Sequence, residues 1–205
     1  MKASAILAAL AACLATMTAF GAPATDAEAV SLQNVGFYLP RPMQLADFKL
    51  VDQNGAAFTL DDLKQHWTLV AFGYTHCPDV CPMTMAQIRS VKKSLAALDK
   101  ALPLSVVFVS IDPQRDSSEQ LKTYAGLFGN DFLGVGGDPL AVDAFAKQLK
   151  VKYAIAGGTS NTYFIDHTSS VALITPRGEV RALFNVPLRP EAVAADIHRL
   201  AGEHK

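Results

Sequence analysis

Apolar residues along the chain predict strands and helices in alternation. Two short runs, 69–73 and 104–111, are almost continuously apolar, as in strands that are buried on both faces of a sheet. Between them, apolar residues recur every three or four positions, which is typical of one face of an amphipathic helix. These residues are Ile88, Val91, Leu95 and Leu98. The pattern therefore predicts a strand, a helix and a second strand, in this order.

Turn and capping signals place elements before this unit. Asn54-Gly55 is a strong hairpin signal, and it separates two short runs at 48–51 and 57–60. Thr59 followed by Asp62 is a weak form of the capping box that begins a helix. We therefore expect an N-terminal hairpin and then a short helix.

Further elements are expected after the second central strand. Asp116 followed by Glu119 predicts the start of a helix. A turn at 176–178 predicts a strand pair at 171–175 and 180–184. Apolar periodicity predicts a helix around Leu121, Tyr124 and Phe128, an inserted helix around Val142, Phe145 and Leu149, and a final helix around Val193, Ile197 and Leu200.

This order of elements predicts the fold class. Alternating strands and helices followed by an antiparallel pair give an α/β protein whose mixed central sheet carries helices on both faces. That is the order of a thioredoxin-like fold, here with an N-terminal hairpin and an inserted helix.

The first residues are typical of an export signal. Lys2 precedes an unbroken run of apolar and small residues that ends near Ala22. Cleavage would give a soluble periplasmic protein, whereas an uncleaved run of about 20 residues would serve as an inner-membrane anchor. Residues 10–13 also resemble a lipobox, which would make Cys13 a lipidated N-terminus. All three outcomes place the folded domain outside the cytoplasm.

We therefore expect three regions. Residues 1–22 are a signal peptide or membrane anchor, residues 23–46 are a linker and lead-in arm, and residues 47–205 are the folded domain. Removal of the signal takes away Lys2, which leaves 18 − 1 = 17 basic and 19 acidic residues and a net charge of −2.

Composition narrows the class of function. The chain has 205 residues, of which 50% are hydrophobic and 18% are charged, so it is not a disordered chain. Its 18 basic and 19 acidic residues lack the basic excess that nucleic-acid binding requires. Three cysteines are too few for a disulfide scaffold, so a cysteine pair is expected to be functional.

Residues 73–82 carry the main chemical signal, with Cys77 and Cys81 one helical turn apart. They join the end of a predicted strand to the start of a helix. At that spacing the two Cα atoms lie about 6 Å apart, which a disulfide tolerates. A helix N-terminus also favours the thiolate over the thiol. The pair could cycle between dithiol and disulfide, bind a soft metal, or simply be buried.

Two thiolates leave a metal incompletely coordinated, and the histidines offer a third ligand. The side chain of His76 is expected to point away from the side that its neighbour Cys77 faces. His167 follows a flexible stretch at 157–161, so a loop could carry its imidazole over the cysteines or leave it in solvent. The other three are expected at the surface, His66 and His198 on predicted helices and His204 at the terminus.

Other polar residues are weaker candidates. Asp79, Asp112 and Asp116 could orient a ligand or contact a partner, although turn initiation by Asp112 and helix capping by Asp116 are the simpler roles. Arg115 is either a partner contact or a solvated charge. Met83 and Met85 could supply thioether ligands, but methionines beside an amphipathic helix usually belong to the core.

Three segments together resemble the Sco/SenC family of copper chaperones. They are residues 72–82, residues 109–116, and Asp166-His167-Thr168 ahead of a strand that ends in Pro176-Arg177-Gly178. The resemblance runs from about Phe48 to Leu200. It implies a thioredoxin-like fold and a site for one copper ion made by Cys77, Cys81 and His167. The imidazole of His76 and a short spacer before the domain depart from the family's pattern.

The donor set is consistent with copper. Soft thiolates select Cu(I), and imidazole accommodates both Cu(I) and Cu(II). Structural zinc usually takes four protein ligands, and no fourth cysteine or histidine stands at a useful spacing.

Two functions follow as hypotheses. The first, implied by the resemblance, is a metallochaperone that delivers copper to the binuclear centre of cytochrome c oxidase. Its partners would be the copper-binding subunit of that oxidase and a periplasmic thiol reductase. The alternative is an enzyme, a thiol–disulfide oxidoreductase in which Cys77 and Cys81 form the redox-active pair and reduce the cysteines of the target site. Spacing argues against a third hypothesis, a redoxin-class peroxidase.

Overall fold

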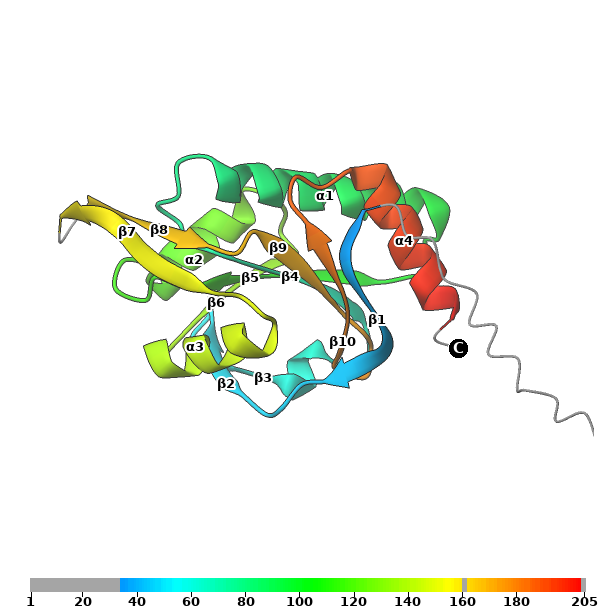
Figure 1. Ribbon diagram of the computed structural model, residues 1–205, viewed down its shortest axis with the longest axis horizontal. Helices are drawn as coiled ribbons and strands as arrows, with labels where there is room; N and C mark the ends of the chain where they lie inside the picture. The colour runs from blue at the N-terminus through cyan, green and yellow to red at the C-terminus, as the bar shows by residue number, and fades with distance from the viewer. Residues whose placement is uncertain (1–33, 160–161, 204–205) are drawn as a thin grey trace, which may run out of the picture. The chain divides into compact units, whose positions relative to one another are not determined.

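The computed structural model describes residues 34–159 and 162–203. In this part of the chain the strands form an eight-stranded sheet and a separate two-stranded sheet (Figure 1). Across the large sheet the order is β1 (Val35–Gln44), β10 (Glu179–Asn185), β9 (Ser170–Ile174), β4 (Trp67–Gly73), β5 (Leu104–Ser110), β6 (Phe132–Gly136), β2 (Lys49–Asp52) and β3 (Ala57–Thr59). Strands β4, β5 and β6 are parallel, and the other neighbours are antiparallel. The mixed sheet is the one that the order of elements predicted.

Helices cover both faces of this sheet. α1 (Val80–Leu98), α2 (Ser118–Gly126) and α4 (Pro190–Gly202) pack on one face, and α3 (Pro139–Gln148) packs with the short 3-10 helix η1 (Leu60–Leu63) on the other. Side chains along β4 alternate between the two cores. Leu69 and Ala71 belong to the core with α1, whereas Val70 and Phe72 belong to the core with α3.

Most predicted elements are confirmed with shifts of a few residues. Asn54-Gly55 turns the hairpin between β2 and β3, and the capping box of Thr59 and Asp62 begins η1. The periodic residues of α1 are buried except Leu98, which ends the helix and is 55% exposed.

Residues 35–44 form strand β1, although the sequence analysis assigned them to a linker. The segment holds two prolines and no alternation, so its local pattern gives no strand signal. Pro40 and Pro42 are tolerated because β1 is an edge strand, and its pairing with β10 is irregular between Tyr38 and Met43. The assignment is set by the partner strand, which lies about 140 residues further along the chain.

The α2 helix begins one residue later than predicted. Ser117 and Gln120, not Asp116 and Glu119, form the capping box, with a Gln120 N–H to Ser117 Oγ distance of 3.3 Å. Asp116 does not cap the helix because its carboxylate accepts hydrogen bonds from Thr75 instead.

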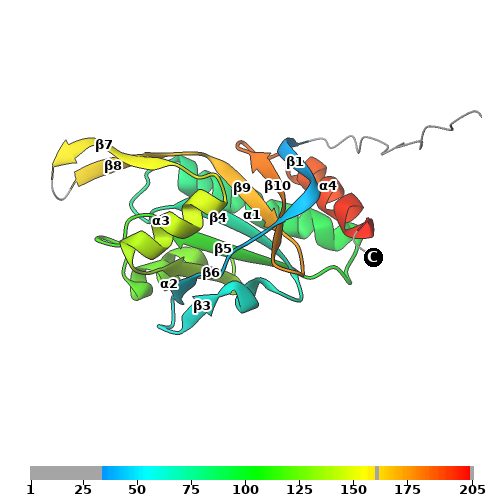
Figure 2. The same ribbon diagram turned by 60° about the horizontal axis from the view of Figure 1, so that its bottom comes forward.

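Three further strands were not predicted from the sequence. β6 is short and holds two glycines, and Gly134 leaves room for the backbone of Leu121, which a Cβ would meet at 2.8 Å. β7 (Tyr153–Thr159) and β8 (Thr162–His167) form the two-stranded sheet, which extends beyond the end of the large sheet (Figures 1 and 2). Gly157 and Gly158 sit inside β7 with positive φ, so residues 157–159 of the stretch interpreted as flexible belong to a strand.

Within the described residues, no helix combines the length and apolar character needed to cross a membrane. The predicted signal or anchor, with its possible lipidation site Cys13, lies outside those residues.

Candidate metal centre

The two cysteines lie at the junction of β4 and α1. β4 ends at Gly73, residues 74–79 form a turn, and α1 begins at Val80. Cys77 is partly exposed in the turn, whereas Cys81 is buried in the first helical turn and is 4% exposed. The Cys81 N–H donates to Cys77 Sγ over 3.4 Å, which holds the first sulfur at the helix N-terminus. Both cysteines are free thiols.

This arrangement makes the two thiols chemically unequal. The hydrogen bond shared with Cys81 is the main influence on Cys77, and it lowers the pKa of Cys77 to about 5 against the opposing effect of burial. The Asp79 and Cys81 backbone amides lower it further. The same shared hydrogen bond and its own burial raise the pKa of Cys81. Cys77 is therefore a thiolate at neutral pH, and Cys81 keeps its proton.

Alkylation should report this difference. In a Cys13→Ser background, iodoacetamide is expected to modify Cys77 rapidly and Cys81 slowly. Because the folded pKa is depressed, the rate at Cys77 should stay level from pH 8 to pH 6 and fall only as the pH drops through about 5. An ordinary thiol, with a pKa of about 8.5, would lose roughly 25-fold in thiolate between pH 8 and pH 6.5. Peptide mapping by mass spectrometry makes the measurement, and a rate that declines steadily below pH 8 would contradict it.

Gly73 is a site residue that the sequence analysis missed. A Cβ at this position would stand 2.8 Å from Cys81 Sγ and 2.9 Å from the ring of Phe108. Glycine is therefore what allows the buried sulfur to lie against the end of β4. Its position directly before the cysteine turn was the available signal.

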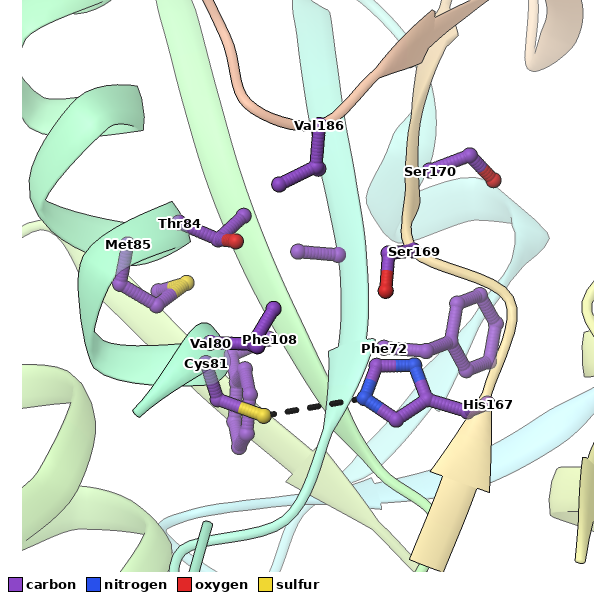
Figure 3. A pocket seen from close by; sticks show the side chains of 11 residues that line it. Phe72, Val80, Cys81, Thr84, Met85, Phe108, His167, Ser169, Ser170 and Val186 are labelled. Atoms are coloured by element: carbon purple, nitrogen blue, oxygen red, sulfur yellow. Dashed lines mark hydrogen bonds between the residues drawn. The ribbon is translucent and has the colours of Figure 1, made fainter. Parts of the chain in front are cut away.

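His167 is the last residue of β8, and its ring faces Cys81 (Figure 3). The distance from its Nε2 to Cys81 Sγ is 3.7 Å. Its Nδ1 lies 3.1 Å from the carbonyl oxygen of Thr168. Because a carbonyl oxygen only accepts, this contact places a proton on Nδ1 and directs Nε2 toward the sulfur. The predicted loop position is wrong, since a strand end holds this imidazole.

The histidine and the cysteines meet between an apolar interior and an open groove. On the inner side, Phe72, Met85 and Phe108 line the space between Cys81 and His167 (Figure 3). On the outer side, Cys77 and His167 line a groove of about 300 Å³ that opens to solvent. The apolar side chains therefore shield the inner side of the site from solvent, and the groove leaves its outer side accessible.

The described residues contain no group of three or more His, Cys, Asp or Glu side chains gathered closely enough to hold a metal ion. What the fold brings together is the pair of Cys81 and His167, with Cys77 one hydrogen bond from Cys81. The donor set of two sulfurs and one imidazole nitrogen suits a soft metal such as copper, and the three side chains would have to move closer together to hold one ion.

The remaining histidines stand apart from the sulfurs. His76 points to Asp116, 3.4 Å from Nδ1 to Oδ1, as expected of a side chain directed away from the cysteine pair. His66 precedes β4 in a bend rather than on the predicted helix, and His198 lies on α4 with Asp99 4.0 Å away. His204 is outside the described residues.

The other polar candidates have mostly structural partners. Asp112 begins a turn, since its carbonyl accepts from the Arg115 and Asp116 amides, and its side chain pairs with Arg115. Arg115 is not a solvated charge, because its side chain is only 15% exposed and pairs with Asp112. Met85 is fully buried core, whereas Met83 is 44% exposed.

Comparison with known proteins identifies the family. The family model described as SCO1/SenC matches residues 40–202. This chain belongs to the SCO1/SenC family. A protein of Stutzerimonas stutzeri is 33% identical to this SCO1/SenC chain over 166 residues, which is 81% of each protein.

Solved structures of the family have the same fold. The structure of Bradyrhizobium japonicum ScoI with copper bound is 34% identical, with a TM-score of 0.67 over 76% of this chain and 98% of that one. A SCO1/SenC family lipoprotein from Bacillus anthracis is 26% identical, with a TM-score of 0.68 over 80% of this chain and 99% of that one. These matches confirm the thioredoxin-like fold predicted for the SCO1/SenC chain.

Proposed function

We propose that this protein is a copper-binding metallochaperone that delivers copper to the binuclear centre of cytochrome c oxidase. One copper ion per chain would be held by Cys77, Cys81 and His167. The observation that carries the proposal is the approach of His167 Nε2 to within 3.7 Å of Cys81 Sγ, beside a second sulfur that is a thiolate at neutral pH.

Two further features support a carrier rather than a storage site. A three-ligand set leaves one side of the ion open, which allows ligand exchange onto a partner. The groove lined by Cys77 and His167 gives a partner's ligands access to that side. The copper-bound relative from Bradyrhizobium japonicum supports copper as the cargo.

Replacing His167 with alanine tests the proposed ligand set. Cu(II) prefers nitrogen and oxygen donors, whereas two thiolates satisfy Cu(I) almost unaided. The His167→Ala variant should therefore lose the thiolate-to-Cu(II) charge-transfer absorption while its Cu(I) affinity falls less. Titration with each ion, Cu(I) in competition with a chelator, makes the measurement.

The matched control is His76→Ala, which removes the imidazole next to Cys77 that points to Asp116. It should leave both titrations unchanged. Equal losses of affinity for the two ions in His167→Ala, or loss of the charge-transfer band in His76→Ala, would contradict the proposed ligand set.

A second candidate function is thiol–disulfide exchange on the cysteines of the target copper site. The observation that favours it is the pairing of an accessible thiolate, Cys77, with a buried protonated thiol, Cys81. Exchange would begin with attack of the Cys77 thiolate on the target disulfide, which forms a mixed disulfide and expels one target thiolate. Cys81, after giving its proton to that thiolate, would attack Cys77 Sγ, form the Cys77–Cys81 disulfide and expel the second target sulfur, so that the target leaves reduced and this chain oxidised. This activity needs no imidazole ligand, so it should survive in His167→Ala, whereas Cu(II) loading should not.

The location and partners are part of the same proposal. The apolar run at residues 1–22 supports export to the periplasm, with anchoring by that run or by lipidation at Cys13. The Bacillus anthracis relative is a lipoprotein, which supports the second route. In that compartment a thiol reductase would be needed to keep Cys77 and Cys81 able to bind metal.

A further inference from the structure

The hairpin that carries His167 is not held to the large sheet by backbone pairing. In the described chain, β7 and β8 pair only with each other (Figure 2). Most of the hairpin is exposed, and its outward Phe164 is 57% exposed. His167 is tied to the large sheet on its C-terminal side, where Ser169 leads into β9 and accepts from the Val186 N–H over 3.3 Å. On its N-terminal side, β8 is held to the domain by side-chain contacts, which therefore help to set the distance between His167 and Cys81.

The contacts that hold β8 to the domain are made by residues on its buried face. Tyr163, Ile165 and His167 alternate along the strand, and the first two are 8% and 7% exposed. The Tyr163 hydroxyl donates to Asp112 Oδ1 over 2.6 Å. The Ile165 N–H donates to the hydroxyl of Tyr74 over 3.4 Å. His167 is the next residue on the face that these two contacts hold down.

The stronger of these two contacts belongs to a group of three side chains, Asp112, Arg115 and Tyr163, each of which contacts the other two. Asp112 is 2% exposed, and its Oδ2 accepts from Arg115 Nε while its Oδ1 accepts from Tyr163. The Arg115 guanidinium carbon lies 3.6 Å from the centroid of the Tyr163 ring. Burial and the bond to Asp112 raise the pKa of Tyr163, so the phenol keeps its proton and remains a donor. A hydrogen bond to a buried carboxylate is among the stronger contacts a neutral side chain makes.

The same loop also holds the cysteine turn. Asp116 accepts from the Thr75 N–H over 2.9 Å and from the Thr75 hydroxyl over 2.6 Å, two residues before Cys77. The Ser110 hydroxyl donates to Asp116 over 2.6 Å and accepts from the Asp112 N–H over 3.0 Å. An unbroken chain of hydrogen bonds thus links the cysteine turn to strand β8 through residues 110–116.

We propose that residues 110–116 are the common support of both halves of the metal site, and that Tyr163 is a positioning residue that holds His167 at Cys81. This inference rests on the proposed function, because its expected consequence is that Tyr163 affects the affinity of the site for Cu(II). Tyr163 itself touches no ligand atom, so it acts only through His167.

Removing one oxygen atom tests this role. The Tyr163→Phe variant keeps the ring over Arg115 and loses the bond to Asp112. Since a hydrogen bond to a charged group contributes enough for roughly a tenfold effect, Cu(II) affinity should fall about tenfold. The charge-transfer absorption should weaken with it, and Cu(I) affinity should change less. Tyr153→Phe is the matched control. Tyr153 lies on β7, where it pairs with His167 of β8, and its hydroxyl bonds to no described residue.

Two further measurements separate positioning from a general loss of structure. In a His167→Ala background, Tyr163→Phe should cause no further loss of Cu(II) affinity, since it acts through the missing imidazole. In copper-free protein, the Ile165 and His167 amides should exchange hydrogen faster in Tyr163→Phe than in Tyr153→Phe. Thermal unfolding of Tyr163→Phe should stay cooperative, with a midpoint only a few degrees below that of Tyr153→Phe, as expected for the loss of one hydrogen bond.

Each outcome supports or overturns the inference. Equal Cu(II) titrations for the two tyrosine variants would overturn it, as would an undiminished effect of Tyr163→Phe in the His167→Ala background. If the wild-type protein gave no charge-transfer absorption at all, the proposed function would fail instead. Amide exchange would then decide the positioning role alone, with faster exchange supporting it and unchanged exchange overturning it.

Discussion

Cys81→Ser should abolish tight binding of Cu(I). The change replaces the buried sulfur that faces His167 Nε2 and leaves one thiolate and one imidazole. Because altering a residue that merely orients a ligand costs about 10- to 100-fold in metal affinity, losing a ligand should cost more than about a hundredfold. Competition titration of reduced protein against a Cu(I) chelator measures the loss.

A nearby substitution controls for damage to the helix. Thr84 also lines the space beside Cys81, one turn further along α1. Thr84→Ser should leave Cu(I) affinity within a few-fold of wild type, and Cys77→Ser should match Cys81→Ser. Full Cu(I) affinity in Cys81→Ser would contradict the assignment of this cysteine as a ligand.

Oxidation of Cys77 and Cys81 to a disulfide should exclude copper completely. Cys77 lies in the turn before α1 and Cys81 in the first turn of that helix, at a spacing that permits the bond. Formation of the S–S bond sends two electrons to an added small disulfide, which is cleaved to one thiol and one thiolate; the single proton comes from Cys81, since Cys77 is already a thiolate. Metal binding requires free thiolates, so the oxidised chain should take up no Cu(I) until a reductant restores both.

The test uses the Cys13→Ser chain, in which these are the only two cysteines. Mass spectrometry first establishes that both thiols are lost, and anaerobic Cu(I) titration follows. The companion Cys77→Ser protein, treated in the same way, shows what oxidant does to a chain that cannot close the bond. Stoichiometric loading of the fully oxidised chain would contradict the prediction.

The cysteine half of the site could be predicted from sequence because it is local. Cys77 and Cys81 are four residues apart, and the strand before them and the helix after them each have a strong pattern. Their geometry follows from one turn of chain and one helix start. The inequality of their pKa values could not be predicted, because it depends on which sulfur is buried and which accepts the Cys81 amide.

The choice of His167 as the third ligand depended on the resemblance to the Sco/SenC family. From local pattern alone His167 could equally have been solvated, since nothing in the surrounding residues shows that β8 ends over α1. The hairpin that carries it was hidden because Gly157 and Gly158 give a loop signal, yet they occupy positive φ within its first strand, β7. Strand β1 was hidden for a related reason, as its two prolines are acceptable only at a sheet edge.

By itself, the sequence determined the elements with strong periodicity, the class of fold, and a pair of thiols at a helix start. These features arise from contacts between residues close together in the chain, where hydrophobic spacing and capping are sufficient. Only the tertiary structure decided which imidazole meets the sulfurs and what holds it there. Tyr163 and Asp112 are 51 residues apart, and His167 and Cys81 are 86 apart. Contacts at such separations come from the packing of the sheet and hairpin, which no local pattern of residues specifies.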